Sequence, residues 1–234
     1  MWKYFYLSAA FLGLILRTDA QVFSYTVNSP IPDGDPTGLA NVQTISSAPG
    51  LSIANLTVTL STSGSGSGGF NGDLYVGLQH ETGFSVLLNR PGKRSGAPQG
   101  YGDSGLNVTF DGSAADDIHN YRFELSGNHA TPLGGALTGV WQPDARNTDP
   151  ATVLDTSSRP ATLDSFANLP VNGQWVLFVA DLSSGGTQTL NSWGMQINAV
   201  PEPAEVAFVV GVSLLGFALW RKHSDARSIP ARSK

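Results

Sequence analysis

Short segments of alternating apolar and polar residues recur along the chain at the length of β-strands. In residues 55–60, Leu56, Val58 and Leu60 share one face, and residues 73–79 repeat the pattern. A two-residue period predicts a strand with one buried face. Similar patterns or short apolar runs predict further strands over residues 22–27, 84–89, 106–110, 137–141, 174–181 and 187–198.

The predicted strand 174–181 is apolar on both faces. Trp175 and Leu177 alternate with Val176 and Phe178. A continuous apolar run of this length is typical of a central strand that is covered on two sides. A Gly-Gly pair follows it, and the next predicted strand contains Trp193, so we expect an antiparallel hairpin whose two indoles seal one end of the core.

Turn-forming residues separate these strands, with 27 Gly and 14 Pro in the chain. Residues 61–69 are almost all Ser, Thr and Gly, which predicts a flexible connection. Gly173, after an Asn, supplies the positive φ of a tight turn. No segment requires a helix of ordinary length. The pattern therefore predicts an all-β domain over residues 21–199, an antiparallel jelly-roll-like β-sandwich of eight or so strands.

The N-terminus has the pattern of a secretory signal peptide over residues 1–20. Lys3 provides the positive charge, residues 5–16 are apolar, and Ala20 is a small residue at the expected cleavage position. About 12 apolar residues are too few to span a bilayer, which argues against an uncleaved anchor. We expect signal peptidase to cleave after Ala20.

The C-terminal residues 200–234 combine a rigid polar motif, an apolar run over 206–220 and a basic cluster. The two motifs are Pro201-Glu202-Pro203 and Arg221-Lys222. As a helix, the run covers roughly 22 Å of a hydrocarbon core that is about 30 Å thick. With Ala204 extending the run and Trp220 at the interface, the pattern predicts a single transmembrane helix over 204–220, with the basic tail in the cytoplasm.

This order of elements resembles the PEP-CTERM sorting signal of Gram-negative and related bacteria. The resemblance implies export, membrane anchoring before C-terminal processing by an exosortase, and a final place in the cell envelope or extracellular matrix. Signals of this type resemble those linked to exopolysaccharide-producing bacteria, so an exopolysaccharide is one candidate partner. The chain departs from the pattern after the basic cluster, where residues 224–234 follow.

Residues 40–198 carry a second resemblance, to the P domain (P/Homo B) of proprotein convertases and bacterial subtilisin-like proteases. The matching motifs are Asn71-Gly72-Asp73-Leu74, the turn at residues 87–92, Asn172-Gly173-Gln174-Trp175, Val179-Ala180-Asp181 and Leu190-Asn191-Ser192-Trp193-Gly194. In that family the domain stabilises a subtilisin-like catalytic domain or helps it to fold. The resemblance implies a free-standing domain that is accessory to a serine endopeptidase. It marks Gly173, Trp175, Asn191 and Trp193 as structural residues.

The sequence contains no catalytic triad. The His-Gly-Thr and Gly-Thr-Ser contexts of that protease class do not occur in it. His119, beside Asp116 and Asp117, is the only acid–base cluster that the sequence suggests. Because no nucleophile accompanies it, we interpret it as part of a solvated loop and predict that the protein is not an enzyme.

Charge and cysteine content narrow the classes further. Only 13% of residues are charged, the net charge is −5 and no basic stripe exists, so nucleic acid is not expected as a partner. Cysteine is absent, which excludes disulfides. Carboxylates at strand ends are candidate calcium ligands, although each is equally explained as a turn residue. They are Asp73, Asp103, Asp111 and Asp181.

Three functions follow from these patterns. The first is an exported, non-catalytic β-sandwich of the envelope or matrix. The second is an accessory domain that acts in trans on a subtilisin-like protease. The third, carbohydrate binding, predicts an exposed aromatic platform, although scattered aromatic residues lie more often in a core than on a platform. The candidates for the platform are Tyr75, Tyr101, Tyr121 and Trp141.

Overall fold

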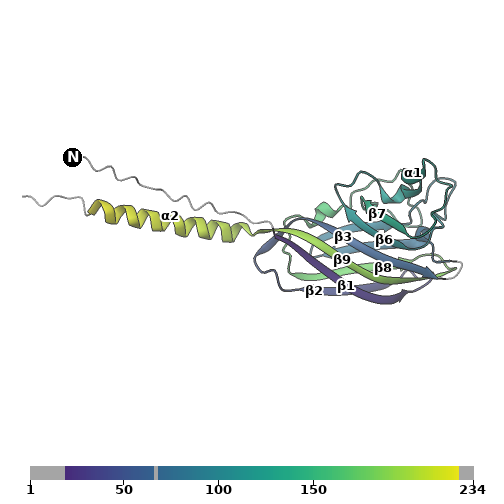
Figure 1. The fold of residues 1–234 in the computed structure, drawn as a ribbon, viewed down its shortest axis with the longest axis horizontal. Coiled ribbons are helices and arrows are strands. Elements are labelled where there is room, and N and C mark those ends of the chain that lie inside the picture. Colours follow the sequence, from purple (N-terminus) through teal and green to yellow (C-terminus); the bar gives the residue numbers. More distant parts are fainter. Residues whose placement is uncertain (1–18, 66–67, 227–234) are drawn as a thin grey trace, which may run out of the picture.

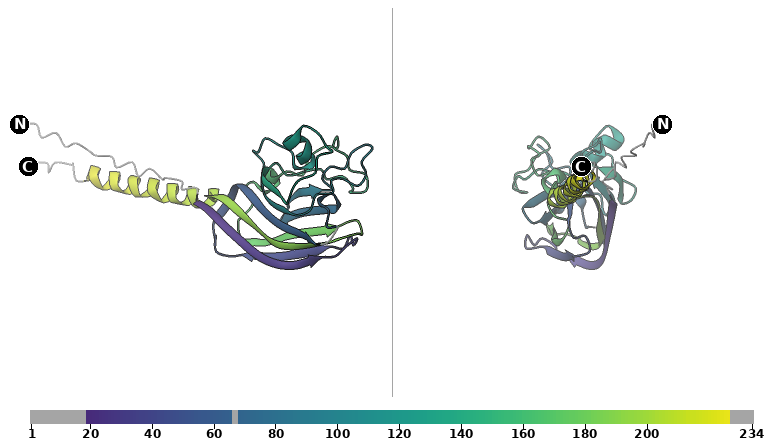
Figure 2. Two further views of the ribbon diagram at one scale, coloured as in Figure 1. Left: turned by 45° about the vertical axis from the view of Figure 1, so that its right-hand side comes forward. Right: turned by 90° about the vertical axis from the view of Figure 1, so that its left-hand side faces the viewer.

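The computed structural model describes residues 19–65 and 68–226. Two β-sheets pack face to face, and a helix extends from one end of the sandwich (Figure 1, Figure 2). The five-stranded sheet contains, in spatial order, β1 (Asp19–Ile31), β9 (Thr187–Pro201), β3 (Leu51–Ser65), β6 (Leu106–Asp111) and β7 (Leu137–Trp141). The four-stranded sheet contains β2 (Leu39–Ile45), β8 (Gly173–Asp181), β4 (Leu74–His80) and β5 (Gly83–Asn89). The predicted all-β sandwich is confirmed.

Short helical elements lie in the connections. These are η1 (Asn71–Asp73), η2 (Ile118–Asn120), α1 (Tyr121–Ser126) and η3 (Leu163–Phe166), and α2 (Pro203–Ala226) follows β9. In Figure 1, α1 lies beside the end of the sandwich that carries β7, whereas α2 projects away from the opposite end. The sandwich itself therefore needs no long helix.

The alternating segments bury the expected faces. Leu56, Val58 and Leu60 of β3 are at most 4% exposed, and the corresponding side chains of β4 and β9 are buried as well. They meet in one core between the sheets. Strands β4 and β5 form a hairpin, and β8, as predicted, lies at the centre of its sheet between β2 and β4.

The hairpin predicted between the two tryptophan-bearing strands is wrong. Trp175 lies on β8 of the four-stranded sheet, and Trp193 lies on β9 of the five-stranded sheet. The chain at Gly185 and Gly186 therefore crosses from one sheet to the other. A Gly-Gly pair permits both a hairpin within one sheet and a crossing between two sheets. The flanking strands show the same alternation in both cases. Both indoles are nevertheless buried, at 0% and 2% exposed.

Two further expectations differ from the structure. Residues 61–65 are not a flexible connection but the end of β3, paired with β9 from Thr62 opposite Leu190 to Ser65 opposite Thr187. Ladder hydrogen bonds here outweigh weak intrinsic strand preference. The sheet is also not purely antiparallel, since β7 pairs with β6 in parallel. The long connection through η2 and α1 allows this, because it returns the chain to the start of β6.

Strand β2 was not predicted, because the polarity of its residues 40–43 is inverted. Asn41 and Gln43 face the interior, whereas Ala40 and Val42 face outward, and Val42 is 50% exposed. The inward amide has a clear role, since Asn41 Oδ1 accepts a 2.8 Å hydrogen bond from the indole nitrogen of Trp193. The outward apolar residues have no such role within the chain.

Candidate functional site

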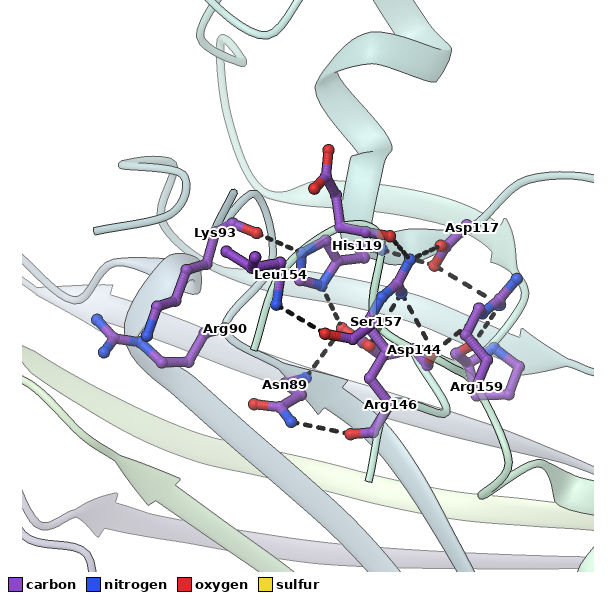
Figure 3. A network of polar contacts seen from close by, with 12 residues as sticks. Asn89, Arg90, Lys93, Asp117, His119, Asp144, Arg146, Leu154, Ser157 and Arg159 are labelled. Atoms are coloured by element: carbon purple, nitrogen blue, oxygen red, sulfur yellow. Dashed lines mark hydrogen bonds and ion pairs between the residues drawn. The ribbon is translucent and has the colours of Figure 1, made fainter. Parts of the chain in front are cut away.

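A buried network of ionised groups connects the loop after β7 with η2. His119 Nδ1 lies 2.7 Å from Asp144 Oδ2, and the other carboxylate oxygen of Asp144 lies 3.1 Å from Arg146 (Figure 3). Arg146 also contacts Asp117 at 2.8 Å. The side chains of His119, Asp144 and Arg146 are at most 2% exposed. The network thus joins residues that lie up to 29 positions apart in the sequence.

The hydrogen bonds of His119 determine its charge. Its Nδ1 faces the Asp144 carboxylate, and its Nε2 lies 2.9 Å from the Lys93 carbonyl oxygen. Both neighbours are acceptors, so only the imidazolium can donate to both. Burial alone would lower the pKa of His119, but the hydrogen bond and charge of Asp144 outweigh it and raise the pKa.

His119 therefore does not belong to a solvated loop, and that interpretation is wrong. Its carboxylate partner is Asp144 rather than Asp116 or Asp117. Asp117 instead caps η2 by accepting a hydrogen bond from the His119 backbone nitrogen. Since His119 and Asp144 are both fully buried, this pair can stabilise the loops but cannot reach a substrate in this conformation.

The other two histidines of the domain also lack a serine or threonine partner among the described residues. His80 is stacked on Trp175, and its ring nitrogens lie 2.7 and 2.8 Å from two backbone carbonyl oxygens. His129 Nδ1 lies 2.6 Å from the Tyr101 hydroxyl group. Burial raises the pKa of Tyr101 to about 12, which opposes formation of a nucleophilic phenolate. The prediction that the protein is not an enzyme stays a prediction.

The four candidate calcium ligands are not brought together. Asp103 and Asp111 lie at opposite ends of β6, and only Asp73 and Asp181 are neighbours, where η1 leads into β4 beside β8. Within residues 19–65 and 68–226, no group of three or more His, Cys, Asp or Glu side chains is arranged to hold a metal ion. Calcium binding stays a prediction.

Asp103 is already saturated with donors. It accepts hydrogen bonds from Arg122, from the Tyr121 hydroxyl at 2.6 Å and from the Leu133 backbone nitrogen at 2.7 Å. Burial raises the pKa of Asp103, but these hydrogen bonds outweigh it and lower the pKa. Asp111 accepts hydrogen bonds from the backbone and hydroxyl of Ser113, as a turn residue does.

Asp73 and Asp181 lie in a different environment from Asp103 and Asp111. Asp73 forms a 3.2 Å ion pair with Arg90, whereas Asp181 accepts only a backbone hydrogen bond, from Ser183. Burial raises the pKa of both carboxyl groups, and the charges of Asp73 and Asp33 contribute to raising that of Asp181 to about 6. Asp181 therefore titrates in the mildly acidic range.

The predicted structural residues have identifiable roles. Gly173 has a φ of 131°, and a Cβ atom there would lie 2.9 Å from the His80 ring. The indole nitrogen of Trp175 donates to the Val171 carbonyl oxygen at 3.1 Å. Asn191 Oδ1 accepts a 3.0 Å hydrogen bond from the Ser63 hydroxyl, which ties β9 to β3. These contacts stabilise the sandwich and its turns.

The aromatic platform predicted for carbohydrate binding does not exist. Tyr101, Tyr121 and Trp141 are at most 4% exposed and belong to the core. Tyr75 differs, because it lies on the outer face of the four-stranded sheet and its ring contacts Phe178 edge-on at 6.2 Å. Both rings line a cleft of about 420 Å³ together with Pro36, Arg90, Asp149, Pro150, Ala151, Ala180 and Leu182.

Most outward residues of this sheet are apolar, and we call this part of the surface the apolar face. Thr44, Gln79 and Gln174 are polar residues on the same side of the sheet. Val176 and Phe178 of β8 are partly exposed on this side, whereas Trp175 and Leu177 on the other side are fully buried. The outward residues of the four strands include no charged side chain. The apolar face comprises Ala40, Val42, Tyr75, Phe84, Val176 and Phe178.

The proposed sorting motif lies at the junction of the domain and α2. Pro201 is the last residue of β9 and pairs with Leu51, and the Glu202 backbone nitrogen donates to the Gly50 carbonyl oxygen at 2.9 Å. Ala20 lies within β1 opposite Asn198, so pairing begins at Asp19, before the predicted cleavage position. The rest of the predicted signal peptide, residues 1–18, lies outside the described residues.

Residues 204–220 are helical, within α2, and Arg221 and Lys222 are exposed on the same helix. Among the helices of the described chain, none combines the length and apolarity that crossing a membrane requires. This finding does not support the predicted transmembrane helix. The uninterrupted apolar run, residues 206–220, is shorter than the about 20 residues that a membrane span needs.

Comparisons with known proteins do not identify the family of this chain. No model of a protein family matches the chain, and no curated protein does. The solved structures that match include the Aeromonas sobria serine protease in complex with its chaperone, at 14% identity and a TM-score of 0.41 over 78% of this chain. The structure of the A. sobria serine protease alone matches at 14% identity and a TM-score of 0.39, over 76%. The match covers 26% of each of those chains. Neither the P domain nor the sorting signal is confirmed by these matches.

Proposed function

We propose that this protein is an exported, non-catalytic binding module of the bacterial envelope or extracellular matrix, and that it docks a partner protein through the apolar face. The observation that carries this proposal is the inverted polarity of residues 40–43 within β2. An edge strand of a solvated sheet normally turns its polar residues outward. Here Val42 faces outward at 50% exposed while Asn41 and Gln43 face inward.

The neighbouring strand supports the same proposal. The apolar run of β8 has the composition of a strand buried on both sides, yet Val176 and Phe178 remain partly exposed within the chain. Together with the exposed Ala40 and Val42 they form an apolar patch, and a contiguous apolar patch on a surface marks a candidate interaction site. The cleft beside Tyr75 and Phe178 provides a concave position for an anchoring side chain, with Arg90 and Asp149 in its lining.

The candidate acid–base groups favour a binding role over a catalytic one. His119 and Asp144 are sealed from solvent, and the pKa of Tyr101 is raised rather than lowered. Because the chain resembles P domains, one proposed partner is a subtilisin-like serine endopeptidase. In that case the protein acts as an accessory domain on a separate protease chain. A matrix protein without protease activity is the other partner that fits an envelope location.

Affinity capture from the native envelope tests the docking proposal. We compare the tagged wild-type protein with Val42→Asp, which places a charge on the apolar face. The matched control is Val22→Asp, the same substitution on the outward side of the other sheet's edge strand, where Val22 is 69% exposed. We expect Val42→Asp to lose the captured protein and Val22→Asp to retain it. An identical set of captured proteins for both variants, with unchanged melting temperature, contradicts the proposal.

A fluorophosphonate probe, which labels active serine hydrolases, then separates the two partners. A labelled protein among those that depend on Val42 identifies the protease-accessory role. Capture of an unlabelled protein identifies a matrix or envelope partner instead.

Export and sorting form a separate part of the proposal. The Pro201-Glu202-Pro203 motif lies where β9 ends and α2 begins, so processing there releases the sandwich from the C-terminal helix. Mass spectrometry of the protein from its native host tests this directly. We expect a mature protein that starts at Gln21 and ends near the motif. Recovery of the intact residues 1–234 contradicts both processing steps.

A further inference from the structure

The outer face of the five-stranded sheet is more polar than the apolar face, with Val22 of β1 and Val140 of β7 as exposed apolar residues on it. Trp193, Met195 and Ile197 of β9 point into the core, so the alternate residues face outward, and the adjacent strands follow the same alternation. We call the polar residues among these outward side chains the polar lattice. It comprises Ser24, Thr26, Asn55, Thr57, Thr59, Ser61, Asn107, Thr109, Asp111, Ser192, Gln196 and Asn198.

The polar lattice is regular and nearly free of charge. Thr57 lies opposite both Gln196 of β9 and Asp111 of β6, and Thr59 lies opposite Thr109. Since strands lie about 4.8 Å apart and alternate residues about 6.8 Å apart, hydroxyl and amide groups repeat on a grid of these dimensions. Asp111 is its only charged member, whereas soluble surfaces normally intersperse Lys, Arg, Glu and Asp.

Several of these side chains are already held in place. Asn198 Nδ2 donates to Asn55 Oδ1 at 2.6 Å, and Asn191 Nδ2 lies 3.4 Å from the Ser61 hydroxyl oxygen. Side chains that are fixed before binding lose less conformational entropy when a ligand arrives. Gln196 is exposed, and within the described chain its side chain has no hydrogen-bond partner, so its amide is available to a ligand.

One end of the polar lattice is hollowed into a groove of about 570 Å³. The groove lies where β3 and β9 meet the turn after β6 and the segment that contains η3. Its polar lining includes Asn55, Thr57, Gln196 and Asn198 and the carboxylates of Asp111 and Asp164. Four apolar residues also line it: Ala54, Leu56, Leu163 and Ala167. No lysine, arginine or aromatic residue lines this groove.

We propose that the groove and the polar lattice bind a neutral polysaccharide chain. Sugar hydroxyl groups both donate and accept hydrogen bonds, and the amides, hydroxyls and carboxylates of this surface offer both functions. The two carboxylates repel anionic polymers, and the absence of cationic side chains removes the usual basis for binding phosphate or nucleic acid. The site lies on the opposite sheet from the apolar face, so it does not depend on protein docking.

Affinity electrophoresis of the purified full-length protein tests this proposal. Native gels contain one of four neutral polysaccharides (dextran, hydroxyethylcellulose, galactomannan or xyloglucan) or anionic alginate. We expect at least one neutral polymer to retard the protein and alginate not to do so. Thr59→Arg, at the centre of the polar lattice, should abolish the retardation. Gln196→Ala should weaken binding about three- to tenfold, as expected for one lost hydrogen bond.

Two control variants make the result specific. Thr44→Arg introduces the same change on the outer face of the other sheet, and Val42→Asp disrupts the apolar face; both should bind polysaccharide as the wild type does. Failure of all four neutral polymers to retard the wild type overturns the proposal. So does retardation that survives Thr59→Arg, or that is lost equally in Thr44→Arg. Because Val42→Asp separates the two faces, loss of protein docking and loss of polysaccharide binding are distinguishable.

Discussion

Removal of the Asp144 carboxylate should destabilise the protein more than any other loss of a charge from the surrounding loops. Asp144→Ala deletes acceptors for three donors: the His119 ring, the Arg146 guanidinium and the Asn89 backbone nitrogen. It leaves two cationic side chains buried at 0% and 2% exposed with one fewer counter-charge. Breaking a buried ion pair from one side costs about 3–5 kcal/mol.

The cost should depend on pH. Asp144 raises the pKa of His119, so the stabilisation from the His119–Asp144 contact is complete below about pH 6.5 and is lost as the pH rises through the folded-state pKa. The share that comes from Arg146 persists throughout. We therefore expect the deficit of Asp144→Ala to be larger at pH 5.5 than at pH 9.5.

Thermal and urea unfolding at several pH values measure this deficit. A loss of 3–5 kcal/mol corresponds to a fall in Tm of roughly 6–20 °C for a domain of this size. The matched control is Asp116→Ala, an exposed carboxylate two residues from η2, which should change stability by less than about 0.5 kcal/mol. If Asp144→Ala loses no more than Asp116→Ala, or if its deficit is the same at both pH values, the network is not the ionised cluster described here.

The remaining predictions concern turns and strand ends. Because the folded-state pKa of Asp181 is raised to about 6, the contribution of Asp181 to stability should fall as the pH rises from about 4 to 6. Asp181→Asn should remove this dependence. In urea unfolding at pH 7, the variant should be more stable than the wild type by at most about 3 kcal/mol. Gly173→Ala should cost about 1–3 kcal/mol through its positive φ and its approach to His80, whereas Gly112→Ala, with open space around it, should not. The calcium prediction requires that EDTA lower the Tm, and an unchanged Tm refutes it.

The sequence predicted the strands whose alternation is simple, because burial of one face forces a two-residue period. Leu56, Val58 and Leu60 show that period, and the structure buries them on β3. Strand β2 escaped prediction because Asn41 and Gln43 face inward and Ala40 and Val42 face outward. Only the structure shows which side of such a strand faces the core.

Long-range relations were not predictable from the pattern. His119 and Asp144 are 25 residues apart in a segment without clear periodicity, and nothing local indicates that they meet in the core. The sequence also failed to place Trp175 and Trp193 in different sheets. The alternation of a strand indicates which of its faces is buried, but not which sheet the strand joins. Both indole nitrogens nevertheless find acceptors, Trp175 at the Val171 carbonyl oxygen and Trp193 at Asn41 Oδ1.

Site-specific photo-crosslinking in the native host tests the central claim most directly. A photoreactive amino acid replaces either Val42 on the apolar face or Thr59 on the polar lattice, and both positions are exposed. A docked partner protein predicts a discrete protein adduct at residue 42 that is absent at residue 59. No adduct at residue 42, or the same adducts at both positions, contradicts a protein-binding role for the apolar face.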